Sequence, residues 1–330
     1  MKNSSVRLLL LFVCFCWLAA ARALAQDAPP EFSAWLAQLR ADARAAGISQ
    51  QTLDAALTGI QAPEPRVISL DQSQPETIQS LQEYVAARVT DRRIAEGRRM
   101  LLQYAAWLGR VEDRYRVQRR FIVALWGIES NYGRHTGTFP VIQALVTLAY
   151  DDRRGSYFRK ELLTALQILD AGHVTLPRMQ GSWAGAMGPF QFMPSSFQHY
   201  AVDADGDGRI NIWDSVPDAL ASAANYLAAA GWRNDETWGR EVRLPENFDA
   251  SLAGLENRLP LARWQELGVR RANGRALPQR DLEASLILPD GRNGPAFLVY
   301  GNFRALLRWN RSVSFAVAVG MLADRLGAED

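Results

Sequence analysis

The sequence has 330 residues, of which 48% are hydrophobic and 22% are charged, and its formal net charge is only +2. This length suffices for a large core or two lobes, and the absence of any block of like charges argues against a nucleic-acid partner. The two cysteines are Cys14 and Cys16, both in an apolar N-terminal stretch. A disulfide scaffold and a thiolate metal site are therefore excluded if that stretch is removed.

The N-terminus has the three parts of a secretory signal peptide. Lys2 and Arg7 precede an apolar run over residues 8–21, and an A-x-A cleavage site follows at residues 23–25. We predict that residues 1–25 are removed and that the mature chain, with a slightly negative formal charge, is periplasmic. The run is short for a membrane span, although an uncleaved anchor is the alternative. The cysteines do not follow the kind of sequence that directs lipidation of a bacterial N-terminus.

Hydrophobic periodicity divides the remaining chain into four regions of a mainly α-helical protein. Residues 31–110 form an N-terminal helical region, with a linker of Pro and Gln residues at 63–75. Residues 111–233 are helical and hold every strong motif. Residues 234–300 are predicted to be a small β-containing insert, and residues 301–326 a C-terminal helix.

The insert carries the clearest strand signal. Ala284–Leu288 and Phe297–Tyr300 are apolar runs of strand length, and a turn-forming Pro289-Asp290-Gly291 stands between them. Prolines recur through the whole insert. We therefore predict a pair of strands within residues 234–300.

Glu129 is the most informative single residue. It ends the unbroken apolar run of residues 121–128, and a helix that is apolar on every face is expected to be buried. Desolvation raises the pKa of a carboxyl group, and the negative end of the helix dipole acts in the same direction. A carboxyl group that stays protonated near neutral pH suits a general acid for glycosidic cleavage. A Glu that only caps or hydrogen-bonds a loop is the alternative.

Residues 203–214 fit the twelve-residue EF-hand loop. Gly208 stands at its sixth position and Ile210 at its eighth. The candidate ligands, with Arg209 contributing its backbone carbonyl, are Asp203, Asp205, Asp207, Arg209, Asn211 and Asp214. Asp214 has a shorter side chain than the Glu usual at the twelfth position, so we expect a weak structural Ca²⁺ site, or one for Na⁺. An acidic loop without an ion is the alternative.

A glycine-rich segment at residues 181–196 is the third motif. Its small residues allow close approach of the backbone to a partner, and they surround Ser182 and Gln191, which can hydrogen-bond a sugar or its amide. A tight packing turn is the alternative. The three histidines lack the spacing of metal ligands and are expected to be surface or local structural residues: His135, His173 and His199.

Taken together and in this order, the motifs resemble the lytic murein transglycosylase B family (family 3), which includes membrane-bound and soluble bacterial enzymes. They are Glu129-Ser130-Asn131-Tyr132-Gly133, Ala184-Gly185-Ala186-Met187-Gly188, Gln191-Phe192-Met193-Pro194-Ser195-Ser196, the Asp203–Asp214 loop, Ala224-Asn225-Tyr226 and Arg308-Trp309-Asn310-Arg311-Ser312. The resemblance extends from about Phe32 to Leu326. The combination is specific, whereas no one short motif is.

The resemblance implies a lysozyme-like helical catalytic core at residues 111–233, with the EF-hand-like loop and the small β domain. It also implies cleavage of the β-1,4 bond between N-acetylmuramic acid and N-acetylglucosamine of peptidoglycan, with formation of 1,6-anhydro ends. Glu129 would be the sole acid and base. Residues expected to line the glycan site are Ser182, Gln191, Tyr226, Trp309 and Asn310. No organic cofactor is expected.

This chemistry needs one carboxyl group because the nucleophile is the 6-hydroxyl of the substrate itself. A peptidoglycan hydrolase that pairs Glu129 with Asp151 or Asp152 is the first alternative, and a murein-binding protein without catalysis is the second. We expect a monomer whose partner is the glycan strand, with other cell-wall enzymes as further candidates.

Trp309 departs from the family, which usually has Tyr before the late Asn. A Trp keeps an aromatic face for a sugar but lacks the phenolic hydroxyl, which leaves a hydrogen bond from this position open. We expect Trp309 to face the glycan site, and a place in the core is the alternative.

Overall fold

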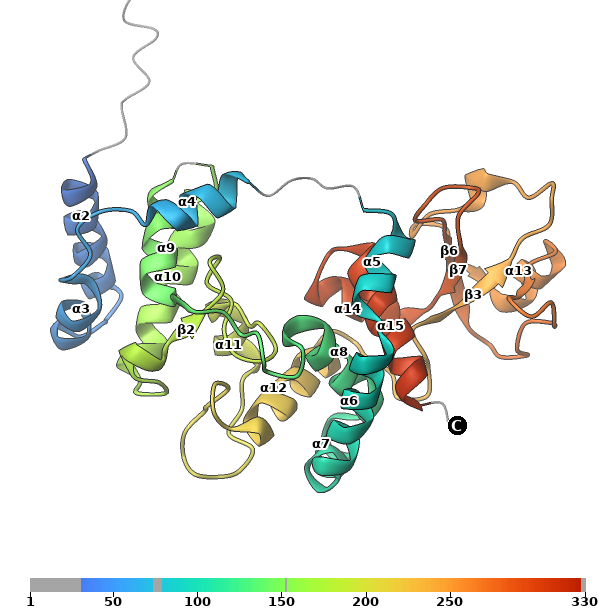
Figure 1. The fold of residues 1–330 in the computed structure, drawn as a ribbon, viewed down its shortest axis with the longest axis horizontal. Helices are drawn as coiled ribbons and strands as arrows, with labels where there is room; N and C mark the ends of the chain where they lie inside the picture. The colour runs from blue at the N-terminus through green and yellow to red at the C-terminus, as the bar shows by residue number, and fades with distance from the viewer. Residues whose placement is uncertain (1–30, 74–78, 152, 328–330) are drawn as a thin grey trace, which may run out of the picture.

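The computed structural model describes residues 31–73, 79–151 and 153–327. Helices make up most of this part of the chain, and a five-stranded sheet lies at one end of an elongated molecule (Figure 1). A separate two-stranded sheet pairs residues 139–140 with residues 180–181. The prediction of a mainly α protein with a small β insert is confirmed. The predicted signal peptide, its predicted cleavage site, both cysteines and Asp152 lie outside the described residues.

The helical elements, in chain order, are α2 (Phe32–Ala45), α3 (Gln50–Leu57), α4 (Pro65–Gln72), α5 (Leu81–Arg88), α6 (Asp91–Gln103), α7 (Ala105–Tyr115), α8 (Arg119–Ser130), α9 (Val141–Tyr150), α10 (Gly155–Asp170), η1 (Leu176–Arg178), α11 (Pro194–Tyr200), α12 (Val216–Ala229), η2 (Ala250–Leu252), α13 (Leu261–Glu266), α14 (Gly301–Trp309) and α15 (Val313–Gly327). The strands are β1 (Phe139–Pro140), β2 (Gln180–Gly181), β3 (Gly239–Arg243), β4 (Leu259–Pro260), β5 (Arg270–Arg271), β6 (Glu283–Ile287) and β7 (Ala296–Val299).

Local sequence explains where several helices begin. At the start of α5, the Ser80 hydroxyl accepts a hydrogen bond from the backbone N–H of Glu83, whose carboxylate accepts one from the backbone N–H of Ser80. This capping box satisfies two N–H groups that the helix itself leaves unpaired. Ser49 and Thr90 cap α3 and α6 in the simpler way, through one side-chain oxygen.

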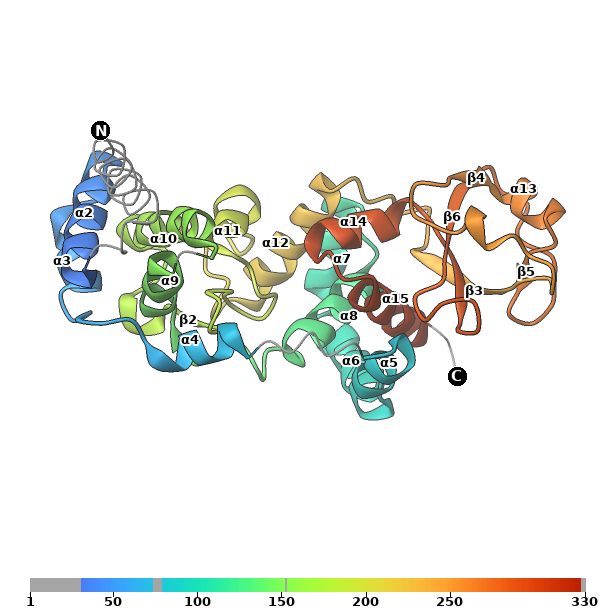
Figure 2. The same cartoon turned by 90° about the horizontal axis from the view of Figure 1, so that it is seen from above.

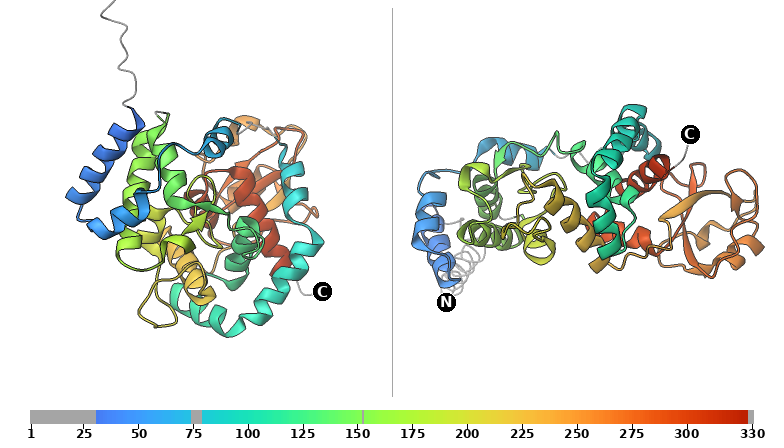
Figure 3. Two further views of the ribbon diagram at one scale, coloured as in Figure 1. Left: turned by 60° about the vertical axis from the view of Figure 1, so that its left-hand side comes forward. Right: turned by 90° about the horizontal axis from the view of Figure 1, so that it is seen from below.

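Three hydrophobic clusters follow one another along the molecule (Figure 2). The first cluster combines α2–α4 with α9–α11, and the left view of Figure 3 shows α2 and α3 beside α9 and α10. The middle cluster is built from α5–α8, α12, α14 and α15, together with Trp238, Ile287, Phe297 and Val299 of the sheet region. The third packs the sheet against α13. Residues 31–110 and residues 111–233 thus each contribute to two clusters.

The sheet has the order β4-β6-β7-β3-β5, with every neighbouring pair antiparallel. Ser285 of β6 pairs with Val299 of β7, so the two strands expected from the sequence form and pair. Trp264 of α13 is fully buried against this sheet and donates its indole N–H to the carbonyl of Ala284 at 3.0 Å. Within the described residues, no helix is both long and apolar enough to cross a membrane.

Candidate active site

Helix α8 carries Glu129 in its last turn. Residues 121–127 are all buried, as the apolar run predicts, and α8 packs against α15 and α6 in the middle cluster. The helix ends at Asn131, which has a left-handed backbone (φ 51°). The Asn131 N–H donates to the Gly127 carbonyl, and the Tyr132 N–H donates to the Trp126 carbonyl, which closes the last turn. Asn tolerates this conformation better than most residues.

Tyr132 fixes the chain just beyond the helix. It also has a left-handed backbone (φ 61°), which is unusual for an aromatic residue, and its hydroxyl donates to the Arg93 carbonyl at 2.8 Å. A Cβ atom on Gly127 would stand 2.7 Å from the tyrosine ring. The glycine in the middle of α8 therefore makes room for the ring that anchors the chain after Glu129.

Ser130 joins the end of α8 to the glycine-rich segment. Its buried hydroxyl donates to the Pro189 carbonyl at 2.6 Å and accepts from the Gly133 N–H at 2.8 Å. The segment itself is folded tightly, because Met187 and Phe192 exchange backbone hydrogen bonds. Two motifs that are about 50 residues apart in sequence are thus held together by one side chain.

The Glu129 side chain is half-buried, and its carboxyl oxygen Oε1 accepts a hydrogen bond from the indole Nε1 of Trp309 at 2.7 Å. Burial raises the pKa of Glu129 to about 8, and the hydrogen bond from Trp309 opposes that rise because it favours the charged form. The carboxyl group is therefore mostly protonated at neutral pH, as a general acid requires.

Aromatic rings surround this hydrogen bond. The Trp309 ring lies 4.5 Å from that of Tyr226 and 5.2 Å from that of Phe192, measured between centroids. The Tyr226 hydroxyl donates to the Arg308 carbonyl at 2.8 Å. Trp309 is half-buried and borders both the first and the middle cluster. The sequence did not settle whether position 309 donates a hydrogen bond. It does: the indole N–H of Trp309 is the donor, and the carboxyl group of Glu129 is the acceptor.

Tyr84 of α5 is a nearby residue that the sequence analysis missed. Burial raises the pKa of Tyr84, the guanidinium of Arg88 lowers it, and the charge of Glu129 raises it further. Arg88 lies over the tyrosine ring, 3.6 Å from its centroid. Tyr84 stands in an ordinary helical pattern far from any motif, so the sequence alone offers no signal for it.

The other predicted glycan contacts have local partners as well. The Ser182 hydroxyl accepts from the Ala186 N–H at 3.0 Å, within the turn of its own segment. Gln191 donates its amide N–H groups to the carbonyls of Thr136 and Gly188, which leaves Oε1 as its acceptor for a ligand. Asn310 is exposed, and its Oδ1 accepts from the Ser312 N–H before α15.

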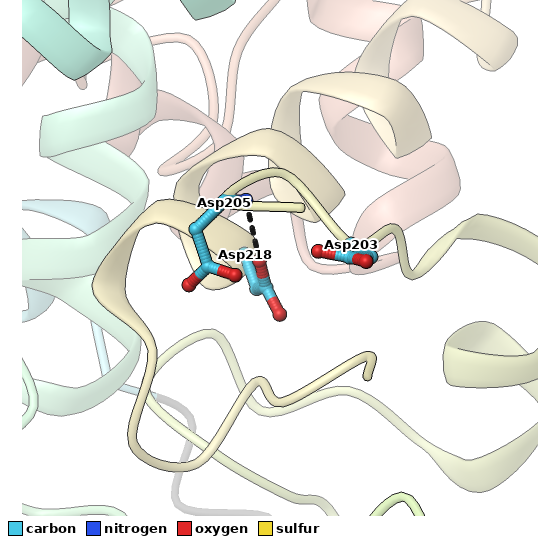
Figure 4. A group of neighbouring side chains, drawn as sticks. All are labelled: Asp203, Asp205 and Asp218. Atoms are coloured by element: carbon cyan, nitrogen blue, oxygen red, sulfur yellow. Dashed lines mark hydrogen bonds between the residues drawn. The ribbon is translucent and has the colours of Figure 1, made fainter. Parts of the chain in front are cut away.

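The acidic loop brings together a different set of carboxylates from the one expected (Figure 4). Oxygen atoms of Asp203, Asp205 and Asp218 all lie within 4.8 Å of one another. Asp218 is fully buried at the start of α12, and it accepts from the Ala204 and Asn211 N–H groups at 2.8 Å each. The twelve-residue pattern missed it, because Asp218 follows the loop's last position.

Asp214, the expected twelfth ligand, instead forms an ion pair with Arg178. The Asp207 side chain accepts from the Arg209 N–H at 2.8 Å, and the Asn211 side chain accepts from the Asp214 N–H at 3.0 Å. These hydrogen bonds stabilise the conformation of the loop. They do not place Asp207 or Asn211 in the group of Asp203, Asp205 and Asp218. The role of Asp214 as a twelfth ligand stays a prediction, and in this structure its carboxylate is paired with the guanidinium of Arg178.

The three gathered carboxylates fit a hard cation that prefers oxygen ligands. Burial raises the pKa of Asp218, backbone hydrogen bonds from Asn211 and Ala204 oppose this rise, and the charge of Asp205 adds to it. A bound cation would remove the repulsion between the carboxylates. Asp203 and Asp205 are less buried than Asp218, so an ion would have access from solvent.

Asp151 lies at the opposite end of α9 from the glycine-rich segment. At the Val141 end, the Val141 N–H donates to the Met179 carbonyl, beside β2. The ten-residue helix is about 15 Å long and ends at Tyr150, whose ring packs on Phe32 and Trp35 of α2. This placement gives no support to Asp151 as a second catalytic carboxylate.

A family model described as "Transglycosylase SLT domain" matches residues 31–324. The membrane-bound lytic murein transglycosylase B of Escherichia coli K12 is 37% identical over 235 residues, which are 67% of this chain and 60% of that protein. The match thus spans less than two thirds of the relative's length.

Solved structures are similar over most of the chain. Pseudomonas aeruginosa SltB3 in complex with NAG-anhNAM-pentapeptide is 49% identical, with a TM-score of 0.87, and the match covers 90% of this chain and 80% of that one. The Escherichia coli lytic transglycosylase Slt35 in complex with calcium is 28% identical, with a TM-score of 0.75, and the match covers 90% and 93% of the two chains.

Proposed function

This chain belongs to the transglycosylase SLT-domain family, and we propose that it is a lytic transglycosylase of peptidoglycan. It would cleave the β-1,4 bond between N-acetylmuramic acid and N-acetylglucosamine and leave 1,6-anhydro ends. The observation that carries the proposal is a single carboxyl group, Glu129, whose burial raises its pKa to about 8 at the meeting point of two motifs. The 49% identity to SltB3, solved with an anhydro-muramoyl peptide, supports the same chemistry.

In the proposed mechanism Glu129 acts first as acid and then as base. Its proton passes to the leaving glycosidic oxygen as positive charge develops on the muramic ring. The resulting carboxylate takes the proton of the substrate's 6-hydroxyl, whose oxygen bonds to the anomeric carbon. The carboxyl group is thereby restored, and no water is consumed. An acid with a pKa of about 8 and the corresponding base can both serve near neutral pH.

We also propose roles for the neighbouring residues. Ser182, Gln191, Tyr226 and Asn310 would contact the glycan, Gln191 through its Oε1. Tyr226 and Trp309 supply aromatic surface beside the acid, which suits a sugar ring.

A calcium ion is proposed for the acidic loop. Asp203, Asp205 and Asp218 would bind it through carboxylate oxygens, and the ion would stabilise the start of α12, the helix that carries Tyr226. Slt35, a relative solved in complex with calcium, supports this assignment. The role is structural, because the evidence for acid–base chemistry lies at Glu129.

The N-terminal sequence supports a periplasmic location for the mature chain, with a cleaved signal peptide. We further propose that the protein acts as a monomer on glycan strands, with the β insert at residues 234–300 as a separate domain.

Product analysis tests the proposed function. Purified murein digested with the mature protein is expected to give muropeptides with anhydro ends in mass spectrometry. New reducing ends would identify a hydrolase instead, and an undigested sacculus that retains the protein would identify a binding protein.

A further inference from the structure

Trp309 is held in one position by its surroundings. Its ring contacts those of Tyr226 and Phe192, and Tyr226 is fixed in turn by the hydrogen bond from its hydroxyl to the Arg308 carbonyl. The backbone of Arg308, the residue before Trp309, thus anchors the Tyr226 ring that packs on Trp309. A side chain fixed in this way can direct a hydrogen bond with little further loss of conformational freedom.

The indole Nε1 is a donor only and does not titrate in the pH range of enzyme activity. Because it donates to Oε1 of Glu129 at 2.7 Å, Oε1 is engaged as an acceptor in both protonation states of the carboxyl group. The transferable proton is then confined to the other oxygen, Oε2.

We propose that Trp309 is a positioning residue for the acid: it holds Oε1 of Glu129 so that Oε2 donates and later accepts the catalytic proton. This inference rests on the proposed function and adds the group that orients its acid. In the first step the Oε2–H bond breaks and the proton goes to the leaving oxygen. The negative charge left on the carboxylate is stabilised by the N–H on Oε1, and Oε2 then takes the proton of the 6-hydroxyl.

Within the described part of the chain, few charged groups compete with Trp309 for the Glu129 carboxyl group. Tyr84 of α5 interacts with the Glu129 charge, and Arg88 lies over the tyrosine ring. On α14, the Arg308 guanidinium donates to the Ala230 carbonyl. On α12, Tyr226 has a pKa raised by burial, and on α6 the Arg93 carbonyl is engaged by Tyr132.

The opposing effect of Trp309 on the pKa of Glu129 agrees with this geometry. Burial favours the neutral acid needed for the first step, whereas the N–H favours the carboxylate needed for the second. Together, burial and the Trp309 N–H allow the Glu129 carboxyl group to be protonated in the first step and deprotonated in the second.

Two variants test the proposal through the pH profile. Trp309→Phe removes the donor and keeps an aromatic ring, so the alkaline limb of kcat/KM should move to higher pH and kcat should fall about 10- to 100-fold, as for the loss of a hydrogen bond to a charged group. Trp309→Tyr offers a phenolic donor and should restore both. Trp107→Phe is the matched control, because Trp107 is also half-buried in the helical region but lies on α7. An unchanged alkaline limb in Trp309→Phe would overturn the proposal.

An NMR titration of the wild-type protein gives a test that does not require activity. The indole N–H resonance of Trp309, identified by its loss in a Trp309 variant, should shift with an apparent pKa near 8 and should not titrate in Glu129→Gln. If the chemical shift of this resonance does not change with pH in the wild type, the hydrogen bond between Trp309 and Glu129 is refuted. Neither result depends on the identity of the products, so the positioning role and the proposed function can fail separately.

Discussion

The hydroxyl of Ser130 donates a hydrogen bond to the carbonyl of Pro189, which lies in the glycine-rich segment, at a distance of 2.6 Å. Ser130 is the residue after Glu129, so this contact sets the segment that carries Ser182 and Gln191 relative to the end of α8. The short sequence motif around Glu129 therefore supplies both the acid and the connection to its neighbours.

Ser130→Ala should lower both stability and activity. The buried Pro189 carbonyl and the Gly133 N–H each lose a partner, which costs about 1–3 kcal/mol of unfolding free energy. We also expect a lower kcat below the melting temperature, because the segment is no longer fixed to α8. Ser285→Ala is the control: Ser285 is buried in the sheet and bonded to the Leu255 carbonyl, so it should cost stability while leaving kcat unchanged. Equal kcat values in the two variants would disprove the positioning effect.

Glu129→Gln should remove activity and preserve the fold. The amide keeps the shape of the side chain and an oxygen for the Trp309 N–H, but it cannot transfer a proton. Loss of a general acid costs at least about 10²- to 10⁴-fold in kcat. Release of muropeptides and circular dichroism measure the two properties. Turnover close to that of the wild type would exclude Glu129 as the sole acid.

The same variant should change how stability depends on pH. The pKa of Glu129 is raised in the folded state, from an ordinary value of 4.5 to about 8. The folded state therefore binds the proton more tightly than the unfolded state does, and the associated stability is complete below about pH 4.5 and lost as the pH rises through about 8. Between about pH 5 and pH 9 the melting temperature of the wild type should fall more than that of Glu129→Gln. Parallel melting curves would contradict the raised pKa.

Calcium should raise the melting temperature by binding only the folded state. Asp203→Asn should abolish this shift, because Asp203 belongs to the carboxylate group with Asp205 and Asp218. Asp214→Asn, the matched control on the same loop, should keep it, because Asp214 pairs with Arg178. If the shift disappears in Asp214→Asn and persists in Asp203→Asn, the ligand set inferred from the structure is wrong.

The sequence predicts the features that depend on neighbouring residues. The apolar run before Glu129 indicates a buried helix, and the alternation of prolines and apolar runs after residue 234 indicates the β insert. Both follow from local periodicity. The pairing of β6 with β7 joins two strands that are consecutive in the chain, separated by residues 288–295.

Contacts between distant residues could not be predicted in this way. Trp309 is 180 positions from Glu129, and which atom of its indole meets the carboxyl group depends on how α14 packs beside α8. Asp218 joins Asp203 and Asp205 from outside the twelve-residue loop, and Asp214 pairs with Arg178, which is 36 positions earlier. The clusters likewise combine segments far apart, such as α2 with α9.

Digestion of murein in water enriched in the heavy oxygen isotope shows whether Glu129 drives an intramolecular transfer without water. The mechanism predicts anhydro products without any incorporated label, because the 6-hydroxyl oxygen of the substrate forms the new bond to the anomeric carbon. Heavy oxygen at new reducing ends from the first turnover onward would show that water is the nucleophile and would contradict the account.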